Sequence, residues 1–286
     1  MTAATLDPSG SVAAVPGRSA ARPVRGLTFP GVLRSEWIKT WSLRSTVWSL
    51  GIAIVLMTGT TALVAWGGST DPVAGELSAA ELIGPGGYFA QLVLAVLGVL
   101  TITGEYSTGQ IRSTVVAVPR RIPALAAKAI VLAVVAALTT LVGVVTATIA
   151  GMPFHDGLGV TLDLSDGETL RLLGGMPLYV AGIALLGFAI GALVRSSPGA
   201  LGIVLGLLLV VEQVVAAIPL AFFDRLEPLL PSNAGSRLVM TQANVDALNA
   251  ASVGVDLGPW QGFGVLLTWV AVLLVLAAVL LRRRDA

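Results

Sequence analysis

Six long apolar runs occur along this chain, and each is about as long as, or longer than, a helix that crosses a lipid bilayer. A membrane-spanning helix takes about 20 predominantly apolar residues. Only 12% of the 286 residues are charged, whereas soluble domains carry roughly one quarter. The sequence therefore predicts an all-α integral membrane protein with six transmembrane helices and no large soluble domain. The runs lie at residues 47–66, 86–103, 124–150, 174–194, 199–220 and 262–281.

Residues 1–30 differ in composition from the rest of the chain. They are rich in Ala, Pro, Ser and Gly, and they lack the apolar core of a signal peptide. We expect them to form a disordered cytoplasmic tail. Residues 31–286 are expected to form one six-span membrane domain.

Basic residues are distributed unequally between the two sets of loops. Lys and Arg in short loops are retained on the cytoplasmic side of the membrane during insertion. They gather before the first run, after the second, after the fourth and at the end of the chain, whereas the other loops are rich in Asp and Glu. The pattern predicts a multi-pass protein of the cell membrane with both termini in the cytoplasm.

The residue types that most enzymes need are missing or isolated. The chain has no cysteine, which excludes disulfides and thiolate sites. Its one histidine, His155, lies in an acidic loop, so neither a serine–histidine pair nor an H-E-x-x-H zinc site can form. There is no G-x-x-x-x-G-K-[ST] loop for ATP either. We therefore expect no enzymatic activity, metal or cofactor on this chain, and no nucleic-acid partner.

Two polar residues, Glu212 and Gln213, interrupt the fifth apolar run. A carboxylate in hydrocarbon costs several kcal/mol unless it is protonated, paired or in contact with water. One interpretation is a polar point on a substrate path or a proton site. The other is a neutral Glu that a neighbouring helix satisfies, or one that lies near the outer end of the span.

The segment before the first run, residues 31–50, is amphipathic at helical spacing. An apolar stripe stands opposite a polar stripe, and Arg34 and Arg44 flank the apolar one. The pattern predicts a helix in the cytoplasmic membrane interface with its tryptophans among the lipid headgroups. A simple positively charged anchor is the alternative. The apolar residues are Leu33, Trp37, Ile38 and Trp41, and the polar residues are Ser35, Glu36, Lys39 and Ser42.

Residues 104–121, with the sequence GEYSTGQIRSTVVAVPRR, carry unusual charge between two apolar runs. Gly109 allows the chain to enter a short helix over residues 110–118, which Pro119 ends. Glu105 can interact with the N-terminus of that helix.

Pairing of Glu105 with Arg44 or Arg112 is a further possibility. A solvated turn explains the arginines of this loop but leaves Glu105 and the apolar STVVAV segment unexplained. The loop therefore favours a docking surface over a mere connection.

Glycines recur four residues apart in two of the runs, as Gly187 with Gly191 and Gly202 with Gly206. Absence of a side chain lets helix backbones approach closely. Both pairs favour packing inside the bundle, with a dimer seam as the alternative.

The last outer loop, residues 221–261, is too long for a simple link between neighbouring helices. Its sequence predicts one or two short helices at the outer interface or dipping into it.

Two motifs stand one hairpin apart in the first part of the chain. The first is R-S-E-W-x-K-x-x-S-L-R-S-T at residues 34–46. The second is G-E-Y-S-T-G-Q-I-R-S-T at residues 104–114, followed by P-R-R. Together they resemble the type-2 ABC transporter permease family, in particular permeases of actinobacteria. Six spans, a structured last loop and an L-P-S-N-A-G element at residues 230–235 are also similar to that family, so the resemblance covers nearly the whole chain.

The resemblance implies roles for particular segments. The helix before the first span is similar to the family's connecting helix, and the first cytoplasmic loop is similar to its coupling helix, which docks into a groove on the ATP-binding subunit. The last outer loop resembles the re-entrant segment of the exit side. The connecting-helix residues would be Arg34, Glu36, Trp37, Lys39, Trp41 and Arg44. The coupling residues would be Glu105, Tyr106, Gly109, Arg112, Pro119, Arg120 and Arg121.

The resemblance also implies partners. Such permeases work as dimers of identical or different chains with two nucleotide-binding subunits, and most export lipids, drugs, antibiotics, peptides or polysaccharides. Because this chain lacks a nucleotide loop, ATP and Mg²⁺ would be bound by a separate ABC ATP-binding subunit. The chain would be the non-catalytic, membrane-spanning subunit of an exporter, embedded in the lipid bilayer.

Two other classes stay open. An ion-coupled secondary transporter would use Glu212 to carry a proton, although other intramembrane charges are few and no internal repeat is evident. A membrane immunity or anchor protein without translocation would have the same sequence features. The substrate does not follow from the sequence.

Overall fold

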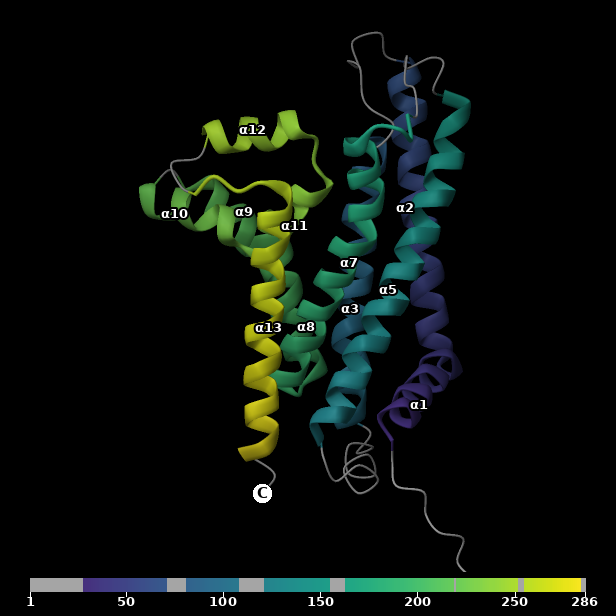
Figure 1. The fold of residues 1–286 in the computed structure, drawn as a ribbon, viewed down its shortest axis with the longest axis vertical. Coiled ribbons are helices and arrows are strands. Elements are labelled where there is room, and N and C mark those ends of the chain that lie inside the picture. The colour runs from purple at the N-terminus through teal and green to yellow at the C-terminus, as the bar shows by residue number, and fades with distance from the viewer. Residues whose placement is uncertain are drawn as a thin grey trace, which may run out of the picture.

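The computed structural model describes residues 28–70, 81–107, 121–154, 163–218, 220–251 and 255–283. Within these ranges the chain forms helices and no strand. Among the described residues, six helical segments are long and apolar enough to cross a membrane (Figure 1). The prediction of an all-α, six-span membrane protein is confirmed. The segments are Arg44–Thr70, Glu81–Ser107, Ile122–Phe154, Gly167–Val194, Ser197–Ala217 and Pro259–Leu281.

Each segment corresponds to one main helix, in some cases extended by a short turn. Five of the six contain the whole predicted apolar run, and the fifth ends at Ala217 instead of residue 220. The main helices are α2 (Arg44–Thr70), α3 (Gly84–Ser107), α5 (Arg121–Gly151), α7 (Gly167–Val194), α8 (Ser197–Gly206) and α13 (Pro259–Arg283). The extensions are η1 (Glu81–Ile83) before α3, η2 (Met152–Phe154) after α5, and a π-helical stretch η3 (Leu207–Val211) that leads from α8 into α9 (Glu212–Ala217).

Helix α7 occupies the centre of the bundle, where it packs against α3, α5 and α13. One glycine on α3 and one on α7 let the backbones of these two helices approach closely. A Cβ at Gly187 would lie 2.4 Å from the carbonyl oxygen of Ala95, and a Cβ at Gly98 would lie 2.1 Å from that of Ala184. Real Cβ atoms essentially never come within 3.0 Å of such an atom. The prediction that the pair of Gly187 and Gly191 packs inside the bundle is confirmed.

The second glycine pair, Gly202 and Gly206 of α8, does not pack in this way. No described atom of another element lies within 4 Å of a Cβ placed at either position. The buried residues of α8 are Ala200 and Val204, which share the opposite face of the helix because they are four residues apart. Within the described residues, the prediction of packing inside the bundle is therefore wrong for this pair.

Both ends of α7 are defined by specific backbone interactions. The Asp166 carboxylate accepts hydrogen bonds from the backbone N–H of Thr169 at 2.8 Å and from its hydroxyl at 3.0 Å. These bonds favour the ionised form and hold the pKa of Asp166 below its ordinary value of 3.8. At the other end, Arg195 adopts a left-handed backbone conformation (φ 58°) and donates its N–H to the Gly191 carbonyl at 2.9 Å. The chain therefore turns directly from α7 into α8.

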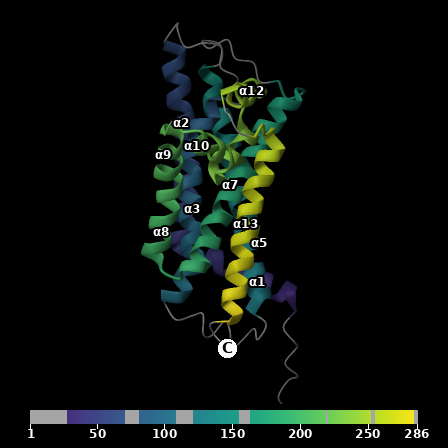
Figure 2. The same ribbon diagram turned by 90° about the vertical axis from the view of Figure 1, so that its left-hand side faces the viewer.

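Short helices form a cap at one end of the bundle (Figures 1 and 2). Helix α11 (Pro231–Ser236) and the turn after it contact α7 and α13, whereas α12 (Gln242–Ala251) lies above α11 in Figure 1. Residues 221–261 form more helices than the one or two that the sequence predicts for this loop. They are α10 (Ala221–Leu226), η4 (Glu227–Leu229), α11 (Pro231–Ser236), η5 (Arg237–Val239) and α12 (Gln242–Ala251).

Helix α1 (Phe29–Ser42) lies at the opposite end, against α5 and the start of α2 (Figure 1). The C-terminal end of α13 reaches the same end of the bundle in both views (Figures 1 and 2). The first and last described helices therefore meet the same side of the membrane, as an even number of spans requires.

Candidate functional site

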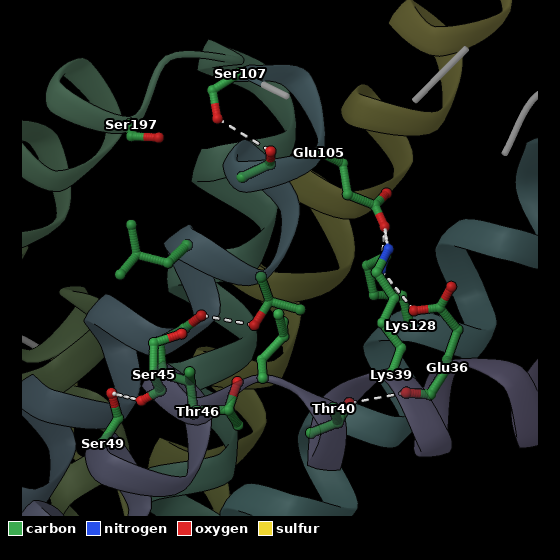
Figure 3. Close-up of a pocket in the computed structure, with 15 residues that line it drawn as sticks. Glu36, Lys39, Thr40, Ser45, Thr46, Ser49, Glu105, Ser107, Lys128 and Ser197 are labelled. Atoms are coloured by element: carbon green, nitrogen blue, oxygen red, sulfur yellow. Dashed lines mark hydrogen bonds and ion pairs between the residues drawn. The ribbon is translucent and has the colours of Figure 1, made fainter. Parts of the chain in front are cut away.

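Four charged side chains from three helices meet at the α1 end of the bundle (Figure 3). Glu36 and Lys39 come from α1, Glu105 from α3 and Lys128 from α5. The Nζ atom of Lys128 lies 2.5 Å from Glu36 Oε2 and 2.9 Å from Glu105 Oε1. Lys39 also donates to Glu105 Oε1. We call these four residues the ionic cluster.

The ionic cluster is largely withdrawn from solvent. The side chains of Glu105 and Lys128 are 4% and 5% exposed, and that of Lys39 is 32% exposed. Two carboxylates face two ammonium groups, so the formal charges balance. Because a buried charge without a partner is strongly destabilising, each member needs the others, and the cluster fixes three helices relative to one another.

The sequence of α1 explains how two of the four side chains reach the cluster. Glu36 and Lys39 are three residues apart, which places them on one face of the helix. On the other side Trp37 and Trp41 are 38% and 48% exposed, with ring centroids 5.9 Å apart in an edge-to-face arrangement. The amphipathic pattern is present as predicted, but Glu36 and Lys39 of its polar stripe bind residues of the bundle, whereas Ser35 and Ser42 are exposed. The aromatic stripe is left facing outward, as an interfacial helix presents it to lipid.

The partners of Glu105 differ from those that the sequence suggests. Lys39 and Lys128 bind its carboxylate. Arg44 is exposed and does not bind it, so the predicted pairing with Arg44 is wrong. The reason is that α1 packs against α5 and against the start of α2. In this position its own Lys39 reaches Glu105 of α3. Arg112 lies outside the described residues.

Lys128 is the one member of the ionic cluster that is not predicted from the sequence. The sequence does contain a signal for it. Residues 129–151, which follow it, carry no Asp, Glu, Lys or Arg. A charge at the edge of such a stretch needs a partner, and Glu105 is the acid at the corresponding edge of the preceding span.

The predicted coupling segment lies largely outside the described residues, but its two ends are described. Helix α3 ends at Ser107, and α5 begins at Arg121. Arg121 is itself one of the predicted coupling residues. The ionic cluster therefore sits beside both ends of this segment. The predicted coupling residues outside the described ranges are Gly109, Arg112, Pro119 and Arg120.

Tyr106, also predicted to take part in coupling, contacts a different element. The Arg195 guanidinium carbon lies 5.3 Å from the centroid of its ring, which is a cation–π geometry. Close by, Ser197 Oγ donates to Thr103 Oγ1 at 2.9 Å. The C-terminal end of α3 thus contacts the α7–α8 turn as well as α1 and α5.

A cavity of about 430 Å³ lies beside the ionic cluster (Figure 3). Its walls combine the charged residues with leucines and with hydroxyl side chains from α1, α2, α3 and α8. Thr40, Ser49 and Thr101 already donate to carbonyl oxygens of their own helices, so their hydroxyl oxygens remain as hydrogen-bond acceptors for a molecule there. The hydroxyl residues include Thr40, Ser45, Thr46, Ser49, Thr101 and Ser197.

Glu212 belongs to a second polar group, near the cap. It is buried, and its Oε1 accepts a hydrogen bond from the backbone N–H of Ser232 at 2.9 Å. The Ser232 hydroxyl lies 3.0 Å from the Tyr179 hydroxyl, which in turn donates to Gln91 Oε1. We call these four residues the outer polar network, where outer means the end of the bundle that carries the cap, and it joins α9, α11, α7 and α3. Gln213 is exposed and takes no part in it.

The arrangement of Glu212 agrees with the interpretation of a carboxyl group satisfied by a neighbouring helix. Within the described residues, no three His, Cys, Asp or Glu side chains form a group that could hold a metal ion. No protein-family model matches the chain, and no curated protein matches its sequence significantly. The ionic cluster and the outer polar network are the features from which a function can be inferred.

Proposed function

We propose that this chain is the non-catalytic, membrane-spanning subunit of an ATP-driven exporter of the type-2 ABC transporter kind, in the cell membrane with both termini in the cytoplasm. A separate ABC ATP-binding subunit would bind ATP and Mg²⁺, and two permease chains would enclose the translocation path. The motifs at residues 34–46 and 104–121 suggest the family. The ionic cluster is the observation that carries the proposal.

In this proposal, the ionic cluster is the first part of the membrane domain that a movement of the ATP-binding subunit displaces. The first motif supplies Glu36 and Lys39, and the second supplies Glu105, so two segments distant in sequence form one structural unit. Lys128 adds the helix that follows the coupling segment. A partner that displaced residues 108–120 would therefore move α1, α3 and α5 together, as a rigid-body transition requires.

Helix α3 links the ionic cluster to the outer polar network. Gln91 and Glu105 lie on this one helix, about 21 Å apart at 1.5 Å per residue. The close glycine-mediated packing of α3 on α7 leaves little room for either helix to shift alone. A displacement of the C-terminal end of α3 would therefore also displace Tyr179 and Ser232, and with them α11 of the cap.

One observation supports an ion-coupled transporter as a second candidate. Glu212 is buried and forms no ion pair within the described residues. It must therefore be neutral or be paired transiently with a cation. Transport driven by a proton or sodium gradient in proteoliposomes without ATP would favour this second candidate.

Purification of the chain with its partner tests the first candidate. The tagged full chain would be extracted in mild detergent from membranes of the organism that encodes it. We expect a protein with a G-x-x-x-x-G-K-[ST] loop to co-purify in stoichiometric amount. Arg112→Ala should insert normally but lose much of this partner, whereas Arg284→Ala, a base beyond the last span, should retain it.

Retention of the partner by Arg112→Ala at the wild-type level would show that the docking assignment is wrong. Absence of any nucleotide-binding partner from the wild-type chain would contradict the proposed function itself. Glu105→Ala is unsuitable for this test, because it would disturb the ionic cluster as well as any docking surface.

A further inference from the structure

A groove of about 300 Å³ lies between α1 and α5, apart from the cavity at the ionic cluster. Five of its six lining residues are apolar, and Arg34 is the sixth. None of the six belongs to the ionic cluster. The lining residues are Leu33, Arg34 and Trp37 of α1 and Ile130, Val131 and Val134 of α5.

The position of the groove along α5 places it just inside the hydrocarbon layer. Lys128 is the last charged residue before the uncharged stretch of residues 129–151. That stretch has the length of about 20 residues needed to cross a bilayer, so Lys128 marks its polar boundary. Val134 follows Lys128 by about 9 Å at 1.5 Å per residue. Ile130 and Val134 are 45% and 43% exposed, so they face acyl chains directly below the headgroups.

Arg34 stands at the headgroup side of this groove. Helix α1 lies level with the boundary, because its Glu36 is bound by Lys128 at 2.5 Å. Arg34 is exposed and makes no ion pair or hydrogen bond with any described residue. A guanidinium group binds phosphate through two parallel hydrogen bonds. Trp37, one turn further along α1, has the amphipathic ring that is typical of headgroup depth.

We propose that this groove binds an anionic phospholipid, with its phosphate on Arg34 and one acyl chain along Ile130 and Val134. Basic side chains beside apolar grooves between membrane helices recognise such headgroups. A zwitterionic lipid offers the same acyl chain, but its own ammonium group offsets the phosphate charge. A lipid with net negative charge therefore matches an unpaired guanidinium better.

The bound lipid bridges α1 and α5, two of the helices that the ionic cluster joins. It would hold α1 against the bundle from the outside while the ionic cluster holds it from the inside. The site does not depend on transport or on an ATPase.

Native mass spectrometry tests the proposal on the full chain, released from micelles that contain equal amounts of phosphatidylglycerol and phosphatidylcholine. We expect phosphatidylglycerol adducts to exceed phosphatidylcholine adducts by roughly threefold to tenfold, the range that the attraction of one basic side chain to a lipid of net negative charge provides. Arg34→Gln should bring the ratio close to one. Arg44→Gln, which removes an exposed base that does not line the groove, should keep the wild-type ratio.

A second variant tests the apolar half of the site. Val134→Phe fills the groove without removing charge, and it should lower the amount of retained phosphatidylglycerol while far-UV circular dichroism stays unchanged. Equal binding of both lipids by the wild-type chain would overturn the proposal. A preference that persists in Arg34→Gln, or an unchanged amount of bound phosphatidylglycerol in Val134→Phe, would also overturn it.

Discussion

At the scale of single residues, Lys128 stabilises the fold in a way that no other described lysine does. One ammonium group binds two carboxylates from two different helices, at 2.5 and 2.9 Å, and its side chain is 5% exposed. Glu36 depends on it most, because Glu105 has Lys39 as a second partner. Removal of Lys128 would therefore leave one buried carboxylate without a cation.

We predict that Lys128→Met lowers the free energy of unfolding by about 3–5 kcal/mol, the usual cost of breaking a buried ion pair from one side. Thermal unfolding in detergent, followed by circular dichroism, measures the effect as a fall in Tm. Lys39→Met is the matched control, and its smaller fall is expected because that side chain is 32% exposed. Equal Tm values for Lys128→Met and the wild-type chain would show that the cluster does not fasten the helices.

Asp166 gives a prediction about pH. The hydrogen bonds from Thr169 lower its pKa in the folded protein, so its contribution to stability is complete above the ordinary pKa of 3.8. The contribution is lost as the pH falls through the lowered, folded-state value. Asp166→Ala should therefore have a lower Tm than the wild-type chain at pH 7, and the difference should shrink in strongly acidic buffer. A difference that stays constant down to the acid range would contradict this capping role.

Glu36, Lys39 and Glu105 could be picked out from the sequence, but their contacts could not. The sequence shows which residues are charged near a membrane boundary. Which charges meet depends on how three helices are rotated about their axes, and that is decided by packing across the whole bundle. The sequence therefore suggested Arg44 for Glu105, whereas the fold supplies Lys39 and Lys128.

At the scale of the helices, the two glycine pairs show how far a short motif can be interpreted. Gly187 sits against the backbone of α3, and Gly202 faces open space in the described structure. Both have the same spacing to a second glycine. The motif only makes a close approach of two helix backbones possible. Whether the approach occurs depends on the position of the neighbouring helix.

Substitution by alanine should separate the two glycines. Gly187→Ala would place a Cβ 2.4 Å from the Ala95 carbonyl oxygen, so α3 and α7 must move apart and the protein should lose stability. Gly202→Ala meets no described atom and should be neutral or stabilising by up to about 1 kcal/mol, the difference in helix propensity. The fraction that stays monodisperse after heating in detergent measures both. Equal losses would mean that another surface covers Gly202.

The spans themselves were predictable from the sequence, because bilayer thickness sets the length of an apolar helix. The end of the fifth span was not, since it depends on contacts distant in sequence. There the chain passes through a π-helical stretch, and the Glu212 carboxylate then binds the backbone of α11. The number of short helices in the cap depends on the same packing against α7 and α13.

At the scale of the whole molecule, two polar groups lie at opposite ends of one bundle, and α3 belongs to both. The ionic cluster joins α3 to α1 and α5, and the outer polar network joins it to α7, α9 and α11. Such an arrangement suits a protein that receives a displacement on one side of the membrane and responds on the other.

The proposed function is tested by the ATP hydrolysis of the purified chain together with any protein that co-purifies with it, reconstituted in lipid nanodiscs. We predict vanadate-sensitive hydrolysis that elutes with the chain in size-exclusion chromatography and falls strongly when Arg112 is replaced by alanine. Hydrolysis that never elutes with the intact, monodisperse chain would contradict the central claim that this protein is the membrane subunit of an ATP-driven exporter.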